Sequence, residues 1–324
     1  MDLVNFLSME YFAAVADKRN FTRAADQLHI TQQTLSAHIA SLERELNCQL
    51  FLRRSPLELT YAGQVFLRYA LQFQQEYQAL KHEFCDITAN QRGLLRVGIA
   101  YTRGRVIMPR VIPAFQTVYP NIQVDLLEAS NDELHARLLD GTVDLAVAAF
   151  AHSVPEIELQ PFYQEEVCML VPQTLLPLLE YAPPEGPLSP KDLAAFRSCP
   201  FALGIPEDIA GQLSRRLIKA AGFHPIVRAQ SENMETLLAL CAQGVGISFC
   251  PDVLASAALS QGSLDGLKVF RFQEDSTYAI RFGYRCQPYQ WSMISEFIRI
   301  ARSVFPDPAC CGRLIHASQS RITE

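Results

Sequence analysis

The sequence predicts an α/β protein that is preceded by a smaller helical unit. The N-terminal part has apolar side chains at helical spacing, and one uninterrupted helical stretch follows it. Short apolar segments that alternate with helical segments fill the rest of the chain. A chain of 324 residues is also too long for one ordinary core, so we expect two or three domains.

The composition fits well-packed globular domains. Hydrophobic residues make up 49% of the chain and charged residues 19%, which argues against a disordered protein. The chain starts with an acidic residue where a secretion signal has basic ones, and it contains no apolar run of membrane-spanning length. We therefore expect a cytoplasmic protein. The net charge of −6 gives no basic footprint, so a motif has to carry any argument for DNA binding.

The first sixty or so residues predict three short helices. The first helix has an apolar face at Leu7, Tyr11, Ala14 and Val15. The second begins near Asn20 or Thr22, either of which can act as its cap. The third runs from Gln32 to about Leu46 after Thr31 as N-cap, with one buried stripe at Leu35, Ile39, Leu42 and Leu46.

The residues of the third helix that lie off this stripe are short, polar and nearly uncharged. Such a face can enter a major groove, since Gln pairs bidentately with adenine and Ser reads either strand. Any amphipathic three-helix unit also has a polar face, so composition alone leaves both interpretations open. The candidate DNA-reading residues are Thr31, Gln32, Gln33, Thr34, Ser36, Ala37 and His38.

The N-terminal segment resembles the signature of LysR-type bacterial regulators. The matching residues are Phe12, Phe21-Thr22, Ala24-Ala25, Leu28, Ile30-Thr31-Gln32, Leu35-Ser36, Ile39, Leu42-Glu43, Leu46, Leu50-Phe51, Arg53, Leu59-Thr60 and Ala62-Gly63. The resemblance implies a winged helix-turn-helix over residues 1–60 that binds double-stranded DNA. It also implies that Arg53 or Arg54 contacts the minor groove or the DNA backbone.

Two positions depart from the family pattern. Ala37 stands where the family usually has Arg or another long polar residue; Ala can contact a thymine methyl group but cannot bond to guanine. Asn47 stands where Gly is common, and Asn tolerates the left-handed conformation. Because the segment is close to neutral, one copy should bind DNA weakly and several copies should be needed.

Residues 61–90 predict one long helix with a heptad seam. The seam consists of Phe66, Ala70, Phe73, Tyr77, Leu80, Phe84 and Ile87. A helix packed on its own domain is the alternative, but the narrow seam with Gln-rich flanks favours contact with a second chain. The resemblance implies the same dimerising linker helix and suggests a homotetramer.

The region 91–305 predicts two similar α/β halves. The expected strands are 95–100, 122–126, 143–148, 161–172, 201–204, 226–229, 246–250, 269–272 and 278–284. The first half has βαβαβ order, with its first helix expected near Pro109, and therefore predicts a parallel sheet with helices on both faces. Residues 291–305 form a last helix, and 306–324 read as a flexible tail.

These halves resemble the periplasmic-binding-protein-like, effector-binding domain of LysR regulators. The resemblance rests on Arg92-Gly93, Leu95 to Gly98, Gly141 to Ala146, Ala221 to Phe223 and Gly244 to Ile247, together with several prolines. It implies lobe I at about 91–163 and 269–305, and lobe II at about 164–268.

Small-molecule ligands of such folds bind between the lobes, at strand ends and helix N-termini. The candidate effector residues are Tyr101, Thr102, Arg103, Ser130, Asn131, Ile205, Pro206, Ser231 and Ser248. Thr102, Ser130 and Ser231 can equally be helix caps. Arg103 suggests an anionic or zwitterionic effector, because a guanidinium binds carboxylate bidentately. Glu128, Glu207 and Asp208 lie in the same loops and can pair with it instead.

Other classes fit the sequence less well. An enzyme needs a convergent catalytic set, and the seven histidines are dispersed without an HExxH motif or a phosphate loop. We therefore expect no enzyme activity, cofactor or metal. A solute-binding protein would lack a helix-turn-helix. A thiol redox sensor of the same fold remains an alternative, although the loop after residue 204 has no Cys. Cys168, Cys241 and Cys250 lie in apolar runs and read as packed, reduced thiols.

Overall fold

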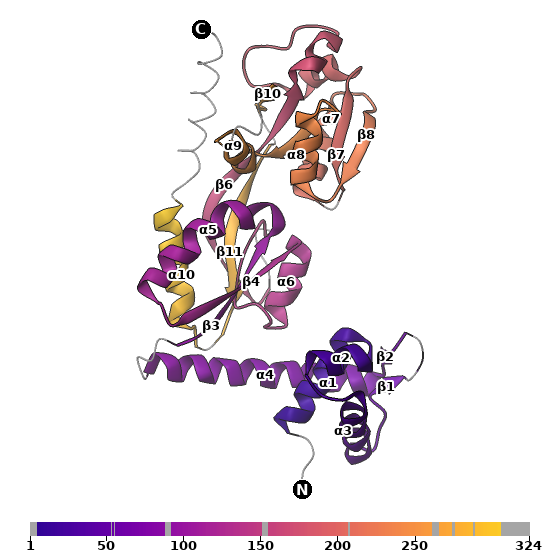
Figure 1. Ribbon diagram of the computed structural model, residues 1–324, viewed down its shortest axis with the longest axis vertical. Helices are drawn as coiled ribbons and strands as arrows, with labels where there is room; N and C mark the ends of the chain where they lie inside the picture. The colour runs from indigo at the N-terminus through magenta and orange to yellow at the C-terminus, as the bar shows by residue number, and fades with distance from the viewer. Residues whose placement is uncertain are drawn as a thin grey trace. The chain divides into compact units, whose positions relative to one another are not determined.

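The computed structural model describes residues 5–52, 54, 56–87, 92–150, 155–206, 208–260, 266–273, 276–287 and 289–305. The chain forms two compact units (Figure 1). The N-terminal unit comprises the chain up to residue 91 together with Gln287–Trp291, and the C-terminal unit comprises the remainder. The predicted tail 306–324 lies outside the described residues. None of the described helices is long and apolar enough to cross a membrane.

The N-terminal unit is a three-helix cluster with a short two-stranded wing. Its elements are α1 (Phe6–Lys18), α2 (Phe21–Gln27), α3 (Gln32–Glu45), β1 (Phe51–Leu52) and β2 (Glu58–Leu59). The stripe predicted on α3 is buried at Leu35, Ile39 and Leu42, against the fully buried Phe12. Asn20 and Thr31 cap their helices through side-chain oxygens, so both local predictions are confirmed.

The long helix α4 (Tyr61–Ile87) completes this unit. Its first turns pack on the cluster, where the rings of Phe66 and Phe12 meet edge-to-face at 4.9 Å between centroids. Phe66 therefore belongs to the core of its own chain, which corrects its assignment to a chain–chain seam. Near the other end of α4 the ring of His82 stacks on Trp291, with centroids 3.9 Å apart.

Lobe I of the C-terminal unit is built on three parallel strands in the order β5-β3-β4. They are β3 (Gly93–Ala100), β4 (Ile122–Ala129) and β5 (Leu145–Ala148), with β11 (Thr277–Arg285) antiparallel beside β5. Helix α5 (Tyr101–Val118) packs against α10 (Ser292–Val304), and α6 (Asn131–Leu139) packs on β3, β5 and β11 (Figure 1).

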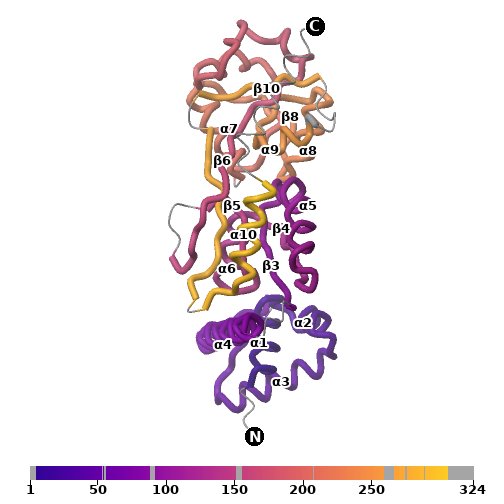
Figure 2. The backbone as a smooth tube through the Cα atoms, turned by 90° about the vertical axis from the view of Figure 1, so that its left-hand side faces the viewer, coloured from indigo at the N-terminus to yellow at the C-terminus, as the bar shows by residue number. Residues whose placement is uncertain are grey.

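One 16-residue strand, β6 (Ile157–Pro172), serves both lobes (Figure 2). Its first part pairs with β11, and its last residues pair with β9 (Ser248–Pro251) and β10 (Leu267–Phe270). Lobe II adds the parallel strands β7 (Pro200–Gly204) and β8 (Ile226–Ser231). Its other elements are η1 (Gln173–Leu178), η2 (Pro190–Phe196), α7 (Ile209–Ala220), α8 (Met234–Ala242) and α9 (Asp252–Ser260).

Two expectations for this unit are corrected by the structure. Helix α5 begins directly at Tyr101, and Pro109 and Pro113 lie inside it. Burial of an apolar stripe that includes Ile107 and Val111 stabilises this helix and compensates for the hydrogen bonds that the prolines cannot make. The sheet is mixed, because β6 and β11 run antiparallel to their neighbours.

Candidate functional site

The polar face of α3 is directed away from the core of the N-terminal unit. Gln32, Gln33, Thr34 and Ala37 are exposed, whereas Ser36 and His38 are half-buried. Thr31 is engaged as the N-cap, since its Oγ1 accepts from the Thr34 backbone N–H at 3.1 Å. The ring of His38 packs edge-on against Tyr11, with centroids 5.1 Å apart. The two Gln side chains, Thr34 and Ala37 are thus the most accessible candidates for base reading.

The wing follows α3 after a tight turn. Asn47 adopts the left-handed conformation, with φ 51°, as its place opposite a family Gly predicts. Arg54 is exposed and pairs with Glu58 across the wing. Arg53, the second wing candidate, lies outside the described residues.

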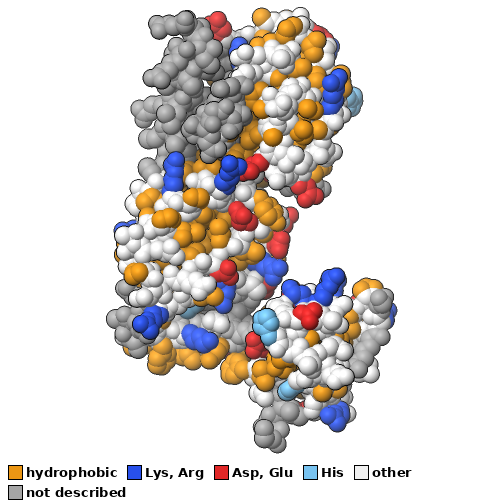
Figure 3. Space-filling model, in the orientation of Figure 1, with side chains coloured by type: hydrophobic (Ala, Val, Ile, Leu, Met, Phe, Trp, Pro, Cys, Tyr) orange, Lys and Arg blue, Asp and Glu red, His pale blue; other side chains and the backbone are white. Residues whose placement is uncertain are grey.

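Of the remaining seam positions of α4, Ala70 is buried and the other five are exposed apolar side chains. Phe73, Tyr77, Leu80, Phe84 and Ile87 are between 43% and 69% exposed. The ring of Phe6, from the start of α1, lies 5.1 Å from that of Tyr77 and extends the same surface. Figure 3 shows hydrophobic side chains gathered along α4. Sequence reasoning missed Phe6, because nothing in the heptad pattern links it to the seam.

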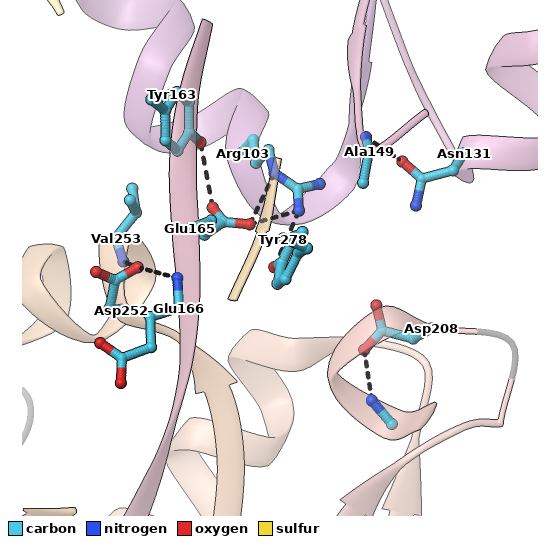
Figure 4. A network of polar contacts seen from close by, with 11 residues as sticks. Arg103, Asn131, Ala149, Tyr163, Glu165, Glu166, Asp208, Asp252, Val253 and Tyr278 are labelled. Atoms are coloured by element: carbon cyan, nitrogen blue, oxygen red, sulfur yellow. Dashed lines mark hydrogen bonds and ion pairs between the residues drawn. The ribbon is translucent and has the colours of Figure 1, made fainter. Parts of the chain in front are cut away.

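In lobe I, Arg103 is buried and already paired. It lies in the first turn of α5, where Nε and Nη2 donate to Glu165 Oε2 at 3.1 and 2.5 Å. Nη2 also donates to the Tyr278 hydroxyl at 3.1 Å, and Tyr163 donates to the other oxygen of Glu165 (Figure 4). Burial opposes the charge on Arg103, but Glu165 together with Tyr278 and Tyr163 outweighs it, and the pKa of the guanidinium is raised. Tyr101 is exposed and Thr102 half-buried in the same turn.

This network corrects the expectation that Arg103 is a free bidentate clamp in a loop. Glu165 and Tyr278 occupy Nε and Nη2, while Nη1 donates to neither group. Glu165 and Tyr278 stand opposite each other on β6 and β11, the two strands that connect the lobes. The one sequence signal for this pairing is the acidic pair Glu165-Glu166, which directly precedes the apolar run Val167 to Pro172 of β6.

The other candidate loops meet the same region from both lobes. Ser130 caps α6, and Asn131 Oδ1 accepts from the Ala149 backbone N–H at 3.1 Å, which leaves the side-chain amide nitrogen of Asn131 as a donor. In lobe II, Ile205 and Pro206 precede Asp208, the N-cap of α7. Figure 4 shows Arg103, Asn131 and Asp208 directed toward one region.

Charge also links Asp208 to this region. Burial raises the pKa of Asp208, and nearby Arg103 acts in the opposite direction. At the surface an ion pair joins the lobes: Arg105 Nη1 of α5 lies 2.7 Å from Glu235 Oε2 of α8.

Ser231 and Ser248 have different surroundings. Ser231 Oγ accepts from the Asn233 backbone N–H at 3.1 Å, so it stabilises the turn before α8. Ser248 is fully buried in β9, and its hydroxyl has no hydrogen-bond partner within the described part of the chain. Ser248 therefore contributes to the core rather than to an open binding surface.

Comparison with known families decides the classification. The family described as "LysR substrate binding domain" matches residues 88–306, and "Bacterial regulatory helix-turn-helix protein, lysR family" matches residues 6–64. The chain belongs to the LysR family. It is a DNA-binding transcription regulator with a substrate-binding domain, and the family consists of regulators rather than enzymes.

Individual LysR relatives align over most of the chain. The uncharacterised regulator YcgK of Bacillus subtilis is 30% identical, over 76% of this chain and 79% of its own. The hydrogen peroxide-inducible genes activator of Haemophilus influenzae is 27% identical, over 82% and 85%.

Two solved structures share the fold. A full-length OxyR variant from Pseudomonas aeruginosa has a TM-score of 0.67 at 21% identity, covering 94% of this chain and 95% of its own. CbnR in complex with its target DNA has a TM-score of 0.59 at 24% identity, covering 93% and 100%.

The cysteines of this LysR protein bear on the redox alternative. Cys168, Cys241 and Cys250 are free and buried in lobe II, as predicted for packed thiols, and Cys199 is free and buried as well. Burial raises the pKa of Cys199 and Cys241, which opposes formation of the reactive thiolate. The Sγ atoms of Cys168 and Cys250 lie 3.9 Å apart across β6 and β9. These surroundings favour a structural role.

Proposed function

We propose that this LysR regulator reads its operator with Gln32, Gln33, Ser36 and Ala37, and contacts the DNA backbone with Arg53 and Arg54. The exposed polar half of α3, held by a buried apolar stripe on its other side, carries the proposal. Because the target is DNA inside the cell, we expect the protein in the cytoplasm.

This sorting of the contacts into base reading by α3 and backbone binding by the wing predicts two different variant phenotypes. Gln33→Ala should relax the sequence preference, whereas Arg53→Ala should weaken binding to every duplex and flatten the salt dependence. Fluorescence anisotropy with an operator selected from random sequences, and with an unrelated duplex, separates the two effects. Equal changes in sequence preference with an unchanged salt dependence would show that the sorting is wrong.

We further propose that α4 pairs two copies of the chain through Phe73, Tyr77, Leu80, Phe84 and Ile87. These side chains recur at heptad spacing and are exposed in the single chain, so a second copy would remove a large apolar surface from water. Each copy contributes one reading head, which compensates for the weak binding of a nearly neutral domain. The family resemblance suggests that two such dimers form a tetramer.

For the substrate-binding domain we propose a small zwitterionic or anionic effector that binds between the lobes. An acidic group would accept from Arg103 Nη1 and from the amide nitrogen of Asn131, and an amine or hydroxyl would face Asp208. The convergence of these three groups from two lobes supports the proposal (Figure 4). Glu165 neutralises Arg103, so the arginine serves as an oriented donor more than as a free charge.

Asn131→Asp tests the effector site. Asp keeps the oxygen that accepts from the Ala149 N–H but replaces the donor by a negative charge, so an acidic effector should bind at least about tenfold more weakly. Asn121→Asp, an exposed position, is the matched control. Thermal-shift screening of organic acids, amino acids and amines provides the readout. A best stabiliser without an acidic group, or one that binds Asn131→Asp unchanged, would refute this site.

A further inference from the structure

Glu43 connects the third helix to the wing. It lies near the end of α3, half-buried, and its Oε1 accepts from the backbone N–H groups of Leu50 at 2.8 Å and Phe51 at 3.2 Å. Its backbone oxygen accepts from the Cys48 N–H at 3.1 Å. One residue therefore fixes both ends of the turn between the candidate reading helix and β1.

The start of the wing is also held from the side of α4. The Leu50 carbonyl accepts from the Thr60 N–H at 3.0 Å, and a Cβ at Gly63 would lie only 2.1 Å from that oxygen. The ring of Phe51 is buried against Phe12, with centroids 4.9 Å apart. Since β1 and β2 pair over two residues each, the direction of the wing is set at this base rather than along its length.

We propose that Glu43 is a positioning residue for DNA binding: it sets the direction of the wing relative to α3, so that base edges and backbone are contacted together. A carboxylate that accepts two N–H groups forms stronger bonds than a neutral acceptor. Without an acceptor, two partly buried N–H groups lose their partner and the base of the wing loosens. The inference rests on the proposed wing contact with DNA.

The test compares three substitutions in the full-length protein. Glu43→Met keeps the size of the side chain without an acceptor, Glu43→Gln restores one oxygen, and Glu45→Met is the neighbouring exposed control. With the selected operator duplex, we expect Glu43→Met to bind about tenfold more weakly and to lower the salt slope by about one. Glu43→Gln and Glu45→Met should stay within about twofold of wild type. A merely structural role would lower the melting temperature without changing the salt slope.

A second background shows whether Glu43 acts through the wing. In Arg53→Ala/Arg54→Ala, which removes the wing's proposed contacts, Glu43→Met should cost almost nothing more. Wild-type binding by Glu43→Met, an undiminished loss in the second background, or no rescue by Gln would each overturn the inference.

Two controls keep the proposals separate. If Arg53→Ala/Arg54→Ala binds like wild type, the wing contact and the role of Glu43 fall together, while base reading by α3 stands. If Arg53→Ala/Arg54→Ala weakens binding but Glu43→Met does not, the wing contact is supported and the role of Glu43 is refuted. Should Glu43→Met fail to fold, Glu43→Asp takes its place: it keeps the charge, but its shorter reach cannot serve both N–H groups, so the same loss is expected.

Discussion

Arg103 illustrates how the environment of a single side chain decides its role. The sequence places an arginine just after a strand, which is a reasonable position for an anion clamp. Its partner Glu165 lies 62 residues away on β6, and local patterning gives no means of pairing the two. The salt bridge is almost completely buried, with side-chain exposures of 4% and 0%. Removing one partner of such a pair strongly lowers the stability of the fold, because the remaining charge is buried without water or a counter-charge.

Glu165→Gln should therefore destabilise the fold strongly. It leaves Arg103 charged, buried and without its counter-charge, and we expect a loss of about 3 kcal/mol or more in the free energy of unfolding. Tyr278→Phe removes one hydrogen bond to Arg103 and should cost about 1 kcal/mol. Glu133→Gln breaks only the surface pair with Arg137 and serves as the control. A urea titration in which Glu165→Gln and Glu133→Gln cost the same would contradict this account.

Asp252, at the start of α9, makes the stability of the fold depend on pH. Burial raises the pKa of its carboxyl to about 6, even though the Glu166 backbone N–H donates to it. Because this pKa is higher in the folded than in the unfolded chain, protonation favours folding. That contribution is complete below pH 4 and is lost as the pH rises to about 6.

Asp252→Asn should remove this pH dependence while keeping an oxygen for the Glu166 and Val253 N–H groups. The free energy of unfolding of the variant minus that of wild type should therefore increase by about 2–3 kcal/mol as the pH rises from 4 to 7. The exposed Asp125→Asn should give a constant difference. Denaturant titrations at several pH values measure both, and a constant difference for Asp252→Asn would disprove the assignment.

Among helices and strands, hydrophobic periodicity predicts local features, such as where a helix runs. The heptad spacing predicted α4 almost to its described ends, and the apolar stripe predicted α3. Periodicity does not tell which turn of a long helix faces its own domain. Phe66 continues the spacing of Phe73 and Tyr77, yet it packs on Phe12. The start of α5 was missed for a related reason, since proline statistics favour helix starts and the burial that tolerates Pro109 is tertiary.

The exposed seam of α4 predicts the assembly state. Tyr77→Asp with Leu80→Asp places two charges on the proposed contact and should give monomers that no longer retain an operator. Gln74→Asp with Gln78→Asp makes the same charge change on the same helix, off the seam, and should leave the assembly intact. Light scattering distinguishes the two variants. An unchanged mass for the seam variant would mean that these side chains do not join two chains.

For the whole molecule, the order of elements was predictable and the pairing of distant strands was not. The βαβαβ order led to three parallel strands, as β5-β3-β4 shows. The expected strand 161–172 spans the predicted lobe boundary at about residue 163, but the sequence does not predict its partners. Only the structure shows how β6 pairs in both lobes, because its partners on β9 and β11 lie far along the chain. The candidate effector site depends on this arrangement, so its residues were predicted only in part.

Lobe II should fold without the rest of the chain. Its core cluster runs from Val167 to Phe272, and among the described hydrophobic residues outside this range Val106 and Tyr278 pack against it. A fragment of residues 166–278 should unfold in one cooperative transition by circular dichroism. A non-cooperative melt would show that lobe II needs lobe I to fold.

The two ends of lobe II also lie side by side, since the Val167 N–H donates to the Ser276 carbonyl at 2.8 Å. A segment that leaves and re-enters a domain at adjacent points can be exchanged with little disturbance to its host. Exchange of this lobe with that of a related chain should therefore leave lobe I and the N-terminal unit with their own sequences. Under the proposed effector site, such an exchange would change the ligand that the protein binds while the proposed DNA contacts of α3 stay the same.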